Sequence, residues 1–584
     1  MKKRRMIALL MVVMLLLTIV SACRSDDPPA GNDAVGGDAV GDDTAGDDTA
    51  AGDDTAGDDT AGDDTADAGG VAVDYWADPM GWIRNQAFDE PIVLTSVRGE
   101  AAAWDFAEGE DVHNNAWMRF FEREMNIRVE YDWTVDGAQY NTRITLALAG
   151  GDVPDFMMVD SATFQMMMED DMLADMTDAF EEFASPRIQE IVSFFPEGMD
   201  SARSPDGRLM AIPILGFGHV AYVEALWLRV DWLEEAGLEP PTTIEELEHI
   251  ARVFMSDFGA SYGIAVESGM WGGVMGLVGF FNAFHSYPTI WVPDADGELA
   301  YGSILPETRN ALERLQSMYE EGIISMEFSV SDTGRVVEDI ANEEVGIMFG
   351  VNWAGMWPLD ATMRQNPDAL WMPFVIPSSD GTPISLSMGF PVWNYIVVNR
   401  DSSDYVPEAV VKLVNGFQVA HDDPQGNFTE AELYNWGVNW HTGPVYFEDP
   451  SDTYQRHIDL VRALETGETD HLTPQRLMIF ENILTWVEDR NVDNFGEYAQ
   501  MGPSGAIHVF SPFMHEGRII VSYLRGAEPE ELLAVGATLN TLRDEVFVRI
   551  IMGEPIELFD QFVQDWLAMG GEAATRAVNE IYNR

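Results

Sequence analysis

The chain has 584 residues, of which 100 are acidic and only 32 are basic, so its net charge at pH 7 is −68. Such a surface repels phosphate backbones and anionic bilayers, which excludes binding to nucleic acid or to a membrane through charge. The chain has one cysteine, Cys23, which excludes an intramolecular disulfide, a cluster of thiolate metal ligands and a catalytic cysteine in the remainder of the sequence.

The first 23 residues have the pattern of a secretory signal. Four basic residues at positions 2–5 precede a run of uncharged, almost wholly apolar residues, 6–20, which is shorter than the roughly 20 residues of a membrane-spanning helix. Small residues and then Cys23 end this run, and the ending resembles the lipobox of bacterial lipoproteins. The resemblance implies that residues 1–23 are a lipoprotein signal and that Cys23 carries the lipid. A plain signal peptide or a short anchor with a chance cysteine is the alternative.

Residues 24–90 are predicted to be a tether and a lead-in to the folded part. Within them, residues 31–70 are built on Gly-Asp-Asp-Thr-Ala units and contain no aromatic side chain. A segment with so little to bury and so many repelling carboxylates is predicted to be disordered. It is expected to lift the folded part away from the membrane, and a repeat expansion without function is the alternative.

The remaining residues, about 500 of them, are too many for one domain and predict two lobes. Their start reads as strand, helix, strand: residues 91–95 and 127–133 have strand patterns, and residues 117–125 have a helical pattern. Another apolar run at residues 156–159 predicts a third strand. This alternation of strands and helices favours parallel sheets covered by helices.

Later segments carry clear start and turn patterns. Thr243 and Glu246 form a capping box that predicts a helix, and Pro407 opens another. Residues 294–298 faintly resemble a calcium loop, but Leu305 stands where such a loop needs its last acidic ligand, so a hairpin turn is expected instead. The ten histidines show no metal-binding spacing, so neither a metal nor another cofactor is predicted.

Motifs distributed over residues 91–584 resemble, in their order, those of extracellular solute-binding protein family 1, the sugar-type receptors of ABC importers. The most recognisable stretch is residues 226–233, followed by Gly-Leu at 237–238 and Pro-Thr-Thr at 241–243. The other motifs that carry the resemblance are residues 152–155, 207–213, 344–350 with 352–353, 395–399 with 407–411, 538–542, 550–553 and 559–563.

This resemblance implies an α/β fold of the two-lobe, periplasmic-binding-protein-like type II, with hinge crossovers and a cleft between the lobes. The first lobe is expected to contain residues 91–210 plus about 372–435, and the second residues 211–371 plus 436–584. It also implies a monomeric, non-enzymatic receptor, anchored by lipid at the outer face of the cell membrane. That receptor would capture a carbohydrate, more specifically an oligosaccharide, and deliver it to the permease subunits of an ABC importer.

Sugars offer apolar C–H faces and rings of hydroxyls, so a site for them needs flat aromatic platforms and polar partners at the edges. The loops at predicted strand ends supply the candidates, with Arg98 and Glu267 as further ones. The ligand-binding residues predicted in this way are Trp104, Asp160, Trp271, Asn352, Trp353, Trp357 and Trp393. Asp160 has the alternative role of a helix cap before Ser161, and Trp357 that of a core residue.

Other functions fit the sequence less well. An extracellular carbohydrate-active enzyme would need a pair of carboxylates, but 100 acidic residues produce such pairs by chance. Neither a Gly-x-Ser-x-Gly elbow nor a His-Glu-x-x-His helix occurs, and no Gly-Lys-Ser/Thr phosphate loop is present, so the ATPase of an importer must be a separate protein. A receptor for a peptide or another polar solute, or one that signals through a sensor kinase, stays open.

Overall fold

The computed structural model describes residues 73–100, 106, 108–216, 220, 222–422, 442–447, 449–526 and 528–582. Residues Asp74–Arg584 form one unit, and the preceding unit, Met1–Val73, falls almost wholly outside the described residues. The predicted signal, Cys23 and the tether are therefore not placed, and neither are Trp104 and the side chain of Trp393.

Two separate clusters of buried apolar side chains divide the unit that starts at Asp74. The first contains residues between Tyr75 and Leu215 and returns between Tyr395 and Phe447. The second contains residues between Val220 and Met388 and returns from Leu460 to Val578. Each core is thus built from two stretches of chain, which confirms the predicted two-lobe α/β fold.

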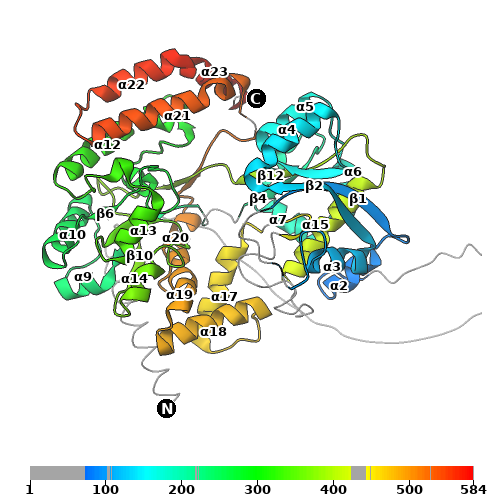
Figure 1. Cartoon of the computed structure of the whole chain (residues 1–584), viewed down its shortest axis with the longest axis horizontal. Coiled ribbons are helices and arrows are strands. Elements are labelled where there is room, and N and C mark those ends of the chain that lie inside the picture. Colours follow the sequence, from blue (N-terminus) through cyan, green and yellow to red (C-terminus); the bar gives the residue numbers. More distant parts are fainter. Residues whose placement is uncertain are drawn as a thin grey trace, which may run out of the picture. The chain divides into compact units, whose positions relative to one another are not determined.

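The first lobe opens with the predicted strand, helix, strand. Strand β1 (Ile92–Glu100) pairs in parallel with β2 (Ile127–Asp136), and helix α3 (Ala116–Met125) connects them. A second sheet has the order β3-β12-β4, with β3 at Phe156–Val159, β12 at Val392–Val398 and β4 at Ile212–Leu215. Strand β12 lies among strands from the first part of the chain (Figure 1).

The prediction of parallel sheets is wrong for this second sheet. Strand β12 runs antiparallel to both β3 and β4. It enters the lobe from the opposite direction because it returns from the second lobe after about 175 residues, rather than through a local helix crossover. All four residues of β3 and all four of β4 are buried, as expected of strands covered on both faces.

Helices of the first lobe cover these strands. Helix α15 is buried along most of its length, so it is central to the core rather than a surface helix. The helices of this lobe besides α3 are α2 (Pro79–Asn85), α4 (Tyr140–Gly150), α5 (Ser161–Glu169), α6 (Thr177–Phe183), α7 (Pro186–Ser193), α8 (Pro196–Asp200) and α15 (Val406–Asp422).

The second lobe is built around a sheet of order β10-β5-β9-β6. Strand β5 runs antiparallel to β9 and β10, and β6 pairs with β9 in parallel. A parallel pair, β11 with β13, and a hairpin, β7 with β8, complete the strands. The bounds are β5 Ala225–Arg229, β6 Ile264–Ala265, β7 Trp291–Pro293, β8 Leu299–Tyr301, β9 Ile347–Gly350, β10 Trp371–Phe374, β11 Leu386–Met388 and β13 Ile519–Val521.

Many helices surround this sheet, and the last three, α21 to α23, pack on one another and on α12 (Figure 1). The helices before the return of the chain to the first lobe are α9 (Val230–Ala236), α10 (Ile244–Asp257), α11 (Val278–Ala283), α12 (Pro306–Glu320), α13 (Thr333–Ala341) and α14 (Asp360–Gln365). Those after it are α17 (Asp452–Thr466), α18 (Pro474–Asp489), α19 (Phe495–Met501), α20 (Ala506–His515), α21 (Glu530–Ile551), α22 (Leu558–Trp566) and α23 (Glu572–Tyr582).

Three crossovers connect the two cores. They lie between β4 and β5, between β11 and β12, and between Phe447 and α17. Residues 372–388, which the predicted division assigned to the first lobe, have their buried side chains in the second core, because β10 pairs with β5. The predicted lead-in also supplies core residues, since Tyr75, Met80 and Ile83 pack in the first lobe.

Local patterns were more reliable than the lobe boundaries. Thr243 caps α10 by accepting a hydrogen bond from the backbone N–H of Glu246, as the capping box predicts. The backbone N–H groups of Asp296 and Glu298 donate to Asp294 between β7 and β8, so the hairpin turn is confirmed. Among the described helices, none is both long and apolar enough to cross a membrane.

Candidate functional site

Three loops meet at one edge of the second lobe's sheet. Ala225 at the start of β5 pairs with Gly350 at the end of β9, because the two strands are antiparallel. Val274 forms an isolated bridge to Gly350 from the glycine-rich loop. The crossover before β5, the loop after β9 and the glycine-rich loop therefore lie together, and strand ends of this kind are where ligands bind in α/β folds.

The loop after β9 presents a pair of tryptophans, Trp353 and Trp357, which we call the aromatic platform. Their side chains are 38% and 41% exposed. The two rings are stacked, with centroids 6.4 Å apart and an interplanar angle of 26°. The alternative of a core role for Trp357 is wrong, since a core indole is not exposed to this extent. Two neighbouring flat apolar faces suit the C–H faces of consecutive sugar rings.

Asn352, predicted to contact the ligand, is buried beneath the platform. Its amide N–H donates to the backbone carbonyl of Val220 in the first crossover, at 2.9 Å, and its amide oxygen accepts from Gln500 of α19. Only 2% of Asn352 is exposed. The amide thus joins three segments of the chain, and direct contact with a ligand stays a prediction. Gln500 could not be found from the sequence, since it lies 148 residues away.

Trp271 of the glycine-rich loop is half-buried and faces the C-terminal helix α21. Its indole N–H donates to Asp544 at 2.7 Å, and the guanidinium of Arg543 lies over its ring at 4.7 Å. These contacts give Trp271 a packing role, and its contact with a ligand stays a prediction. Glu267 accepts a hydrogen bond from Thr333, which ties the same loop to α13.

Glu224, one residue before β5, is a buried carboxyl group at this same edge that the sequence did not single out. Only 4% of it is exposed, and it accepts a hydrogen bond from the backbone N–H of Gly279 at 2.6 Å. Burial raises the pKa of Glu224 to about 8. The group is therefore protonated at neutral pH and adds no negative charge beside the platform.

The corresponding edge of the first lobe contains Asp160, which follows β3. Its carboxylate accepts from the backbone N–H of Thr163 at 2.8 Å and from the side chain of Asn141 at 2.9 Å. Asp160 therefore has the predicted alternative role of capping α5, and its contact with a ligand stays a prediction. Trp104 lies outside the described residues and the side chain of Trp393 is not described, so the contact of either with a ligand also stays a prediction.

Arg98, at the end of β1, lies in a group of tyrosines that the sequence did not reveal. Its guanidinium is 3.9 Å from the sulfur of Met158, and the hydroxyl of Tyr140 donates to the backbone carbonyl of Met158 at 2.9 Å. Burial raises the pKa of the nearby Tyr131 to about 12. Arg98 is buried and the tyrosines are half-buried, so the group is a cluster of hydrogen-bonding side chains around one guanidinium.

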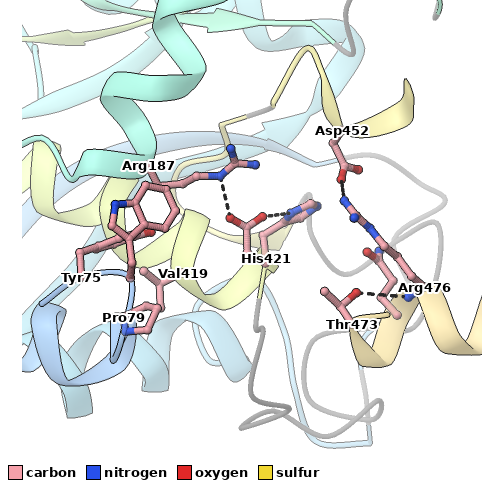
Figure 2. Close-up of a pocket in the computed structure, with 11 residues that line it drawn as sticks. Tyr75, Pro79, Arg187, Val419, His421, Asp452, Thr473 and Arg476 are labelled. Atoms are coloured by element: carbon pink, nitrogen blue, oxygen red, sulfur yellow. Dashed lines mark hydrogen bonds and ion pairs between the residues drawn. The ribbon is translucent and has the colours of Figure 1, made fainter. Parts of the chain in front are cut away.

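A second candidate region is a cavity of about 230 Å³ beside the third crossover, which we call the charged pocket (Figure 2). Trp76, which is 61% exposed, lines it together with Tyr75 and Pro79 from the start of the folded unit. Opposite them are charged and polar residues from α7, from the end of α15 and from the region of α17 and α18: Arg187, His421, Asp422, Asp452, Thr473, Gln475 and Arg476.

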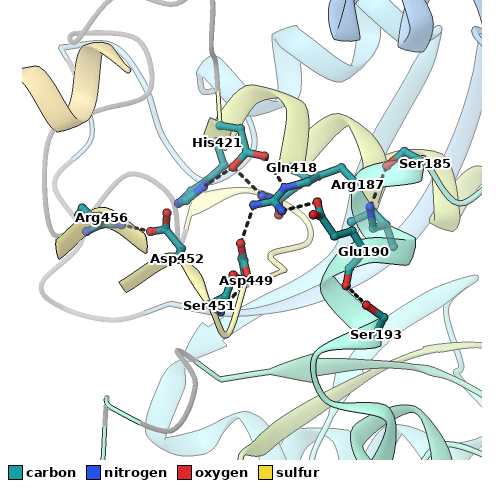
Figure 3. Close-up of polar contacts among 12 residues, drawn as sticks. Ser185, Arg187, Glu190, Ser193, Gln418, His421, Asp449, Ser451, Asp452 and Arg456 are labelled. Carbon is teal, nitrogen blue, oxygen red and sulfur yellow. Dashed lines mark hydrogen bonds and ion pairs between the residues drawn. The ribbon is translucent and has the colours of Figure 1, made fainter. Parts of the chain in front are cut away.

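The charges of this pocket are occupied by one another. Arg187 contacts Asp449 at 2.5 Å, Glu190 at 2.8 Å and Asp422 at 3.2 Å, which joins α7 to the end of α15 and to the third crossover (Figure 3). Asp452, at the start of α17, pairs with Arg456 and with Arg476, the latter at 2.8 Å. The arginines and carboxylates thus form two neighbouring groups, one that joins α7 and α15 to the third crossover and one that joins α17 to α18.

The pKa directions in these two groups follow from burial and pairing. Burial works to raise the pKa of Asp452, but the charges of Arg456 and Arg476 prevail and hold it well below its usual range. For Asp449 burial prevails over Arg187, and its pKa is raised. In the part of the chain that the structure describes, no group of three or more histidine, cysteine, aspartate or glutamate side chains is arranged to hold a metal ion.

Residues 103–415 match the family model described as bacterial extracellular solute-binding protein. This segment is more than half of the chain and runs through all the strands that surround the aromatic platform. The chain belongs to this family. Its resemblance to the family in sequence motifs is thereby confirmed.

Two curated proteins are similar to this family member over part of their length. The polygalacturonan/rhamnogalacturonan-binding protein YtcQ of Bacillus subtilis is 20% identical over 246 residues, which cover 40% of this chain and 46% of YtcQ. The fructooligosaccharide ABC transporter substrate-binding protein FusA of Streptococcus pneumoniae is 24% identical over 153 residues, 25% of this chain and 28% of FusA. The chain thus spans less than half the length of these relatives.

Solved structures share the fold of this solute-binding protein over most of its length. One is a binding protein for HMO from Bifidobacterium longum infantis, with a TM-score of 0.58 and 13% identity, covering 85% of this chain and 99% of that one. Another is an alginate-binding protein solved without calcium ion, with a TM-score of 0.55 and 15% identity, covering 85% and 99%. At such identities the likeness shows the fold alone.

Family membership changes how both regions are interpreted. Proteins of this family are binding proteins that act outside the cytoplasm, and so are the neighbours in structure. A binding protein needs surface that a ligand can contact. The aromatic platform offers two exposed, stacked rings, whereas the arginines and carboxylates of the charged pocket are engaged in ion pairs. The platform is therefore the stronger candidate for the functional site.

Proposed function

We propose that this chain captures a carbohydrate, in particular an oligosaccharide, outside the cell and delivers it unchanged to the permease subunits of an ABC importer. The observation that carries the proposal is the aromatic platform, Trp353 and Trp357, exposed and stacked at the sheet edge beside the first crossover. A ligand stacked there lies next to a segment that joins the two lobes, so closure of the lobes adds contacts from the other side.

The names of relatives support the substrate class without fixing the sugar. FusA is named for fructooligosaccharides and YtcQ for polygalacturonan and rhamnogalacturonan. Both names denote chains of several sugar rings, and two neighbouring indoles suit two rings in succession. We therefore propose an oligosaccharide rather than a monosaccharide as the ligand.

The test is a thermal-shift screen of the mature chain against fructans, pectin fragments, other neutral oligosaccharides, monosaccharides and peptides, followed by calorimetry. We expect one oligosaccharide class to stabilise the protein by mass action, with the ligand recovered intact after incubation. Stabilisation by peptides and by no carbohydrate would contradict the substrate class. Shortened products that accumulate with purified protein would contradict a pure binding role and favour a carbohydrate-active enzyme.

The mode of attachment is a separate part of the proposal. The sequence pattern supports a lipid on Cys23 that holds a monomeric receptor at the outer face of the cell membrane through the acidic tether. Cells fed labelled palmitate should incorporate the label into the wild-type chain and not into Cys23→Ser. Label in the Cys23→Ser chain would show that the lipid is elsewhere. Uptake of labelled ligand by cells would then show transport, and a change in kinase activity without uptake would show signalling.

A further inference from the structure

The aromatic platform has no regular secondary structure to fix its rings. Residues 352–359 form consecutive turns between β9 and α14 rather than a helix or strand. A stacking surface binds well only when its rings are held at a set angle before the ligand arrives. Other elements must therefore hold this loop in place.

Helix α19 packs directly against the platform loop at two points where only glycine fits. A Cβ atom on Gly496 would lie 2.3 Å from Cγ of Met356, which lies between Trp353 and Trp357 in the sequence. A Cβ atom on Gly355 would lie 2.7 Å from Cβ of Ala499. Contacts this short leave no room for an added methyl group unless the loop shifts.

Hydrogen bonds fix the same loop from both sides. Gln500 of α19 donates to Asn352, and Asn352 donates to Val220 of the first crossover. The end of β9 is held as well, since the buried indole of Trp227 donates to the carbonyl of Gly350 at 3.0 Å. At the far end of the loop, Arg364 of α14 pairs with Asp493, just before α19, at 2.7 Å.

From this geometry we infer that α19 is the positioning element of the carbohydrate platform, with Gly496 and Gln500 as its positioning residues. The inference rests on the proposed function and assigns a role to a helix that lies beyond the third crossover. Since Asn352 also bonds the first crossover, the network connects platform orientation to a segment between the lobes. The same contacts that orient the rings are therefore expected to respond when the lobes move.

The experiment compares Gly496→Ala with Gly536→Ala, a matched helical control whose new Cβ would meet only Leu532, at 3.7 Å. The chain has 17 tryptophans that all contribute to near-ultraviolet circular dichroism, so the signal to follow in the ligand-free protein is the part of the spectrum that Trp353→Phe removes. We expect the signal to change in Gly496→Ala and not in Gly536→Ala, and to be absent in Trp353→Phe. An unchanged signal in Gly496→Ala would overturn the inference whether or not a ligand is known.

Ligand affinity provides the second arm of the test. Gly496→Ala and Gln500→Ala should each weaken oligosaccharide binding by about tenfold, because a misplaced stacking surface loses most of its contribution. Combined with Trp353→Ala, neither should weaken binding further, since the element they position is gone. Additive losses would overturn the inference. If Gly496→Ala does not fold, Gln500→Ala, which adds no volume, tests the inference through both the near-ultraviolet spectrum and the ligand affinity.

If the wild-type chain binds no carbohydrate at all, the proposed function fails while the ligand-free spectra still decide whether α19 positions the platform. The reverse is also distinguishable. Tight binding that survives Gly496→Ala and Gln500→Ala together with an unchanged spectrum would support the receptor role and refute the positioning role. The receptor role is therefore tested by ligand binding, and the positioning role of α19 by the ligand-free spectra.

Discussion

The aromatic platform and the charged pocket both contain an exposed tryptophan, but their polar groups are used differently. At the platform, Gln500 hydrogen-bonds to Asn352 and Asn352 to Val220, which holds the loop, while Trp353 and Trp357 stay partly exposed. In the pocket, Arg187 and Arg476 are each within 3.2 Å of at least one carboxylate. A ligand at the platform displaces only water, whereas a charged ligand in the pocket has to break existing ion pairs.

This difference indicates that an exposed tryptophan beside a cavity is not sufficient to define a binding site. What matters is whether the neighbouring polar groups orient the aromatic ring or are engaged with each other. That criterion favours the platform as the proposed recognition surface and the charged pocket as a structural junction beside the third crossover. Each of the following experiments tests one side of the contrast.

Removing Arg187 should have the largest effect, and on stability rather than binding. In Arg187→Met the carboxylate of Asp449, whose side chain is only 3% exposed, loses its cation. Breaking a buried ion pair in this way costs about 3–5 kcal/mol. Chemical denaturation should show this loss, while calorimetry on the folded protein should show unchanged oligosaccharide affinity. A large loss of affinity in folded Arg187→Met would make the pocket part of the ligand site.

Acid should lower the free energy of unfolding through protonation of a buried histidine of α17 rather than of the carboxylates in the charged pocket. His457 of α17 is buried next to His508 of α20 and donates from Nδ1 to the carbonyl of Met501. Burial lowers the pKa of His457 to about 4 from 6.5. The unfolded chain therefore binds a proton that the folded chain rejects, so stability falls as the pH falls from 6.5 towards 4, by about 3 kcal/mol.

His457→Asn retains a donor near the Nδ1 position and does not titrate. Its unfolding free energy should fall less than that of the wild type between pH 7 and 4.5, and the exposed His249→Asn should behave like the wild type. Asp452 keeps its pKa well below its usual range, so it stays ionised over this interval. Identical pH profiles for His457→Asn and the wild type would place the acid sensitivity elsewhere.

Sequence reasoning succeeded where the determinants are local. The cap at Thr243, the turn at Asp294 and the parallel pair of β1 and β2 depend on residues close in the chain, and each is as predicted. Trp353 and Trp357 are exposed after a fully buried strand, which agrees with their predicted position in a loop at a strand end, while their contact with a ligand stays a prediction. Local structure of this kind can be predicted from the spacing of residues within a single segment.

Sequence reasoning was less successful where partners come from distant segments. The antiparallel placement of β12, the assignment of residues 372–388 to the second core and the contact of Trp271 with α21 all depend on the path of the chain between lobes. Gln500 and Gly496 resemble any other helix residues until α19 is seen against the platform. Spacing within one segment does not reveal such pairings, since they are set by tertiary packing.

Replacing the platform ring itself should have a smaller but specific effect. Trp353→Ala should weaken oligosaccharide binding by at least about tenfold, about 1.4 kcal/mol, because it removes a stacking surface from the site. Trp76→Ala in the charged pocket is the matched control, and its affinity should stay within about twofold of the wild type. Equal losses in the two variants would erase the distinction between the regions, and no loss in Trp353→Ala would refute the platform.

A high salt concentration should have the smallest effect on binding, because the proposed site binds its ligand without ionic contacts. Stacking of a neutral oligosaccharide on Trp353 and Trp357 involves no net charge, and the pKa of Glu224, raised to about 8 by burial, keeps that neighbouring group neutral at pH 7. Raising sodium chloride to about 1 M shortens the screening length to about 3 Å, which weakens ionic contacts at exposed positions. The affinity should therefore change by less than about twofold. A steep decline with salt would mean that ionic groups such as those of the charged pocket hold the ligand, and the roles of the two regions would be exchanged.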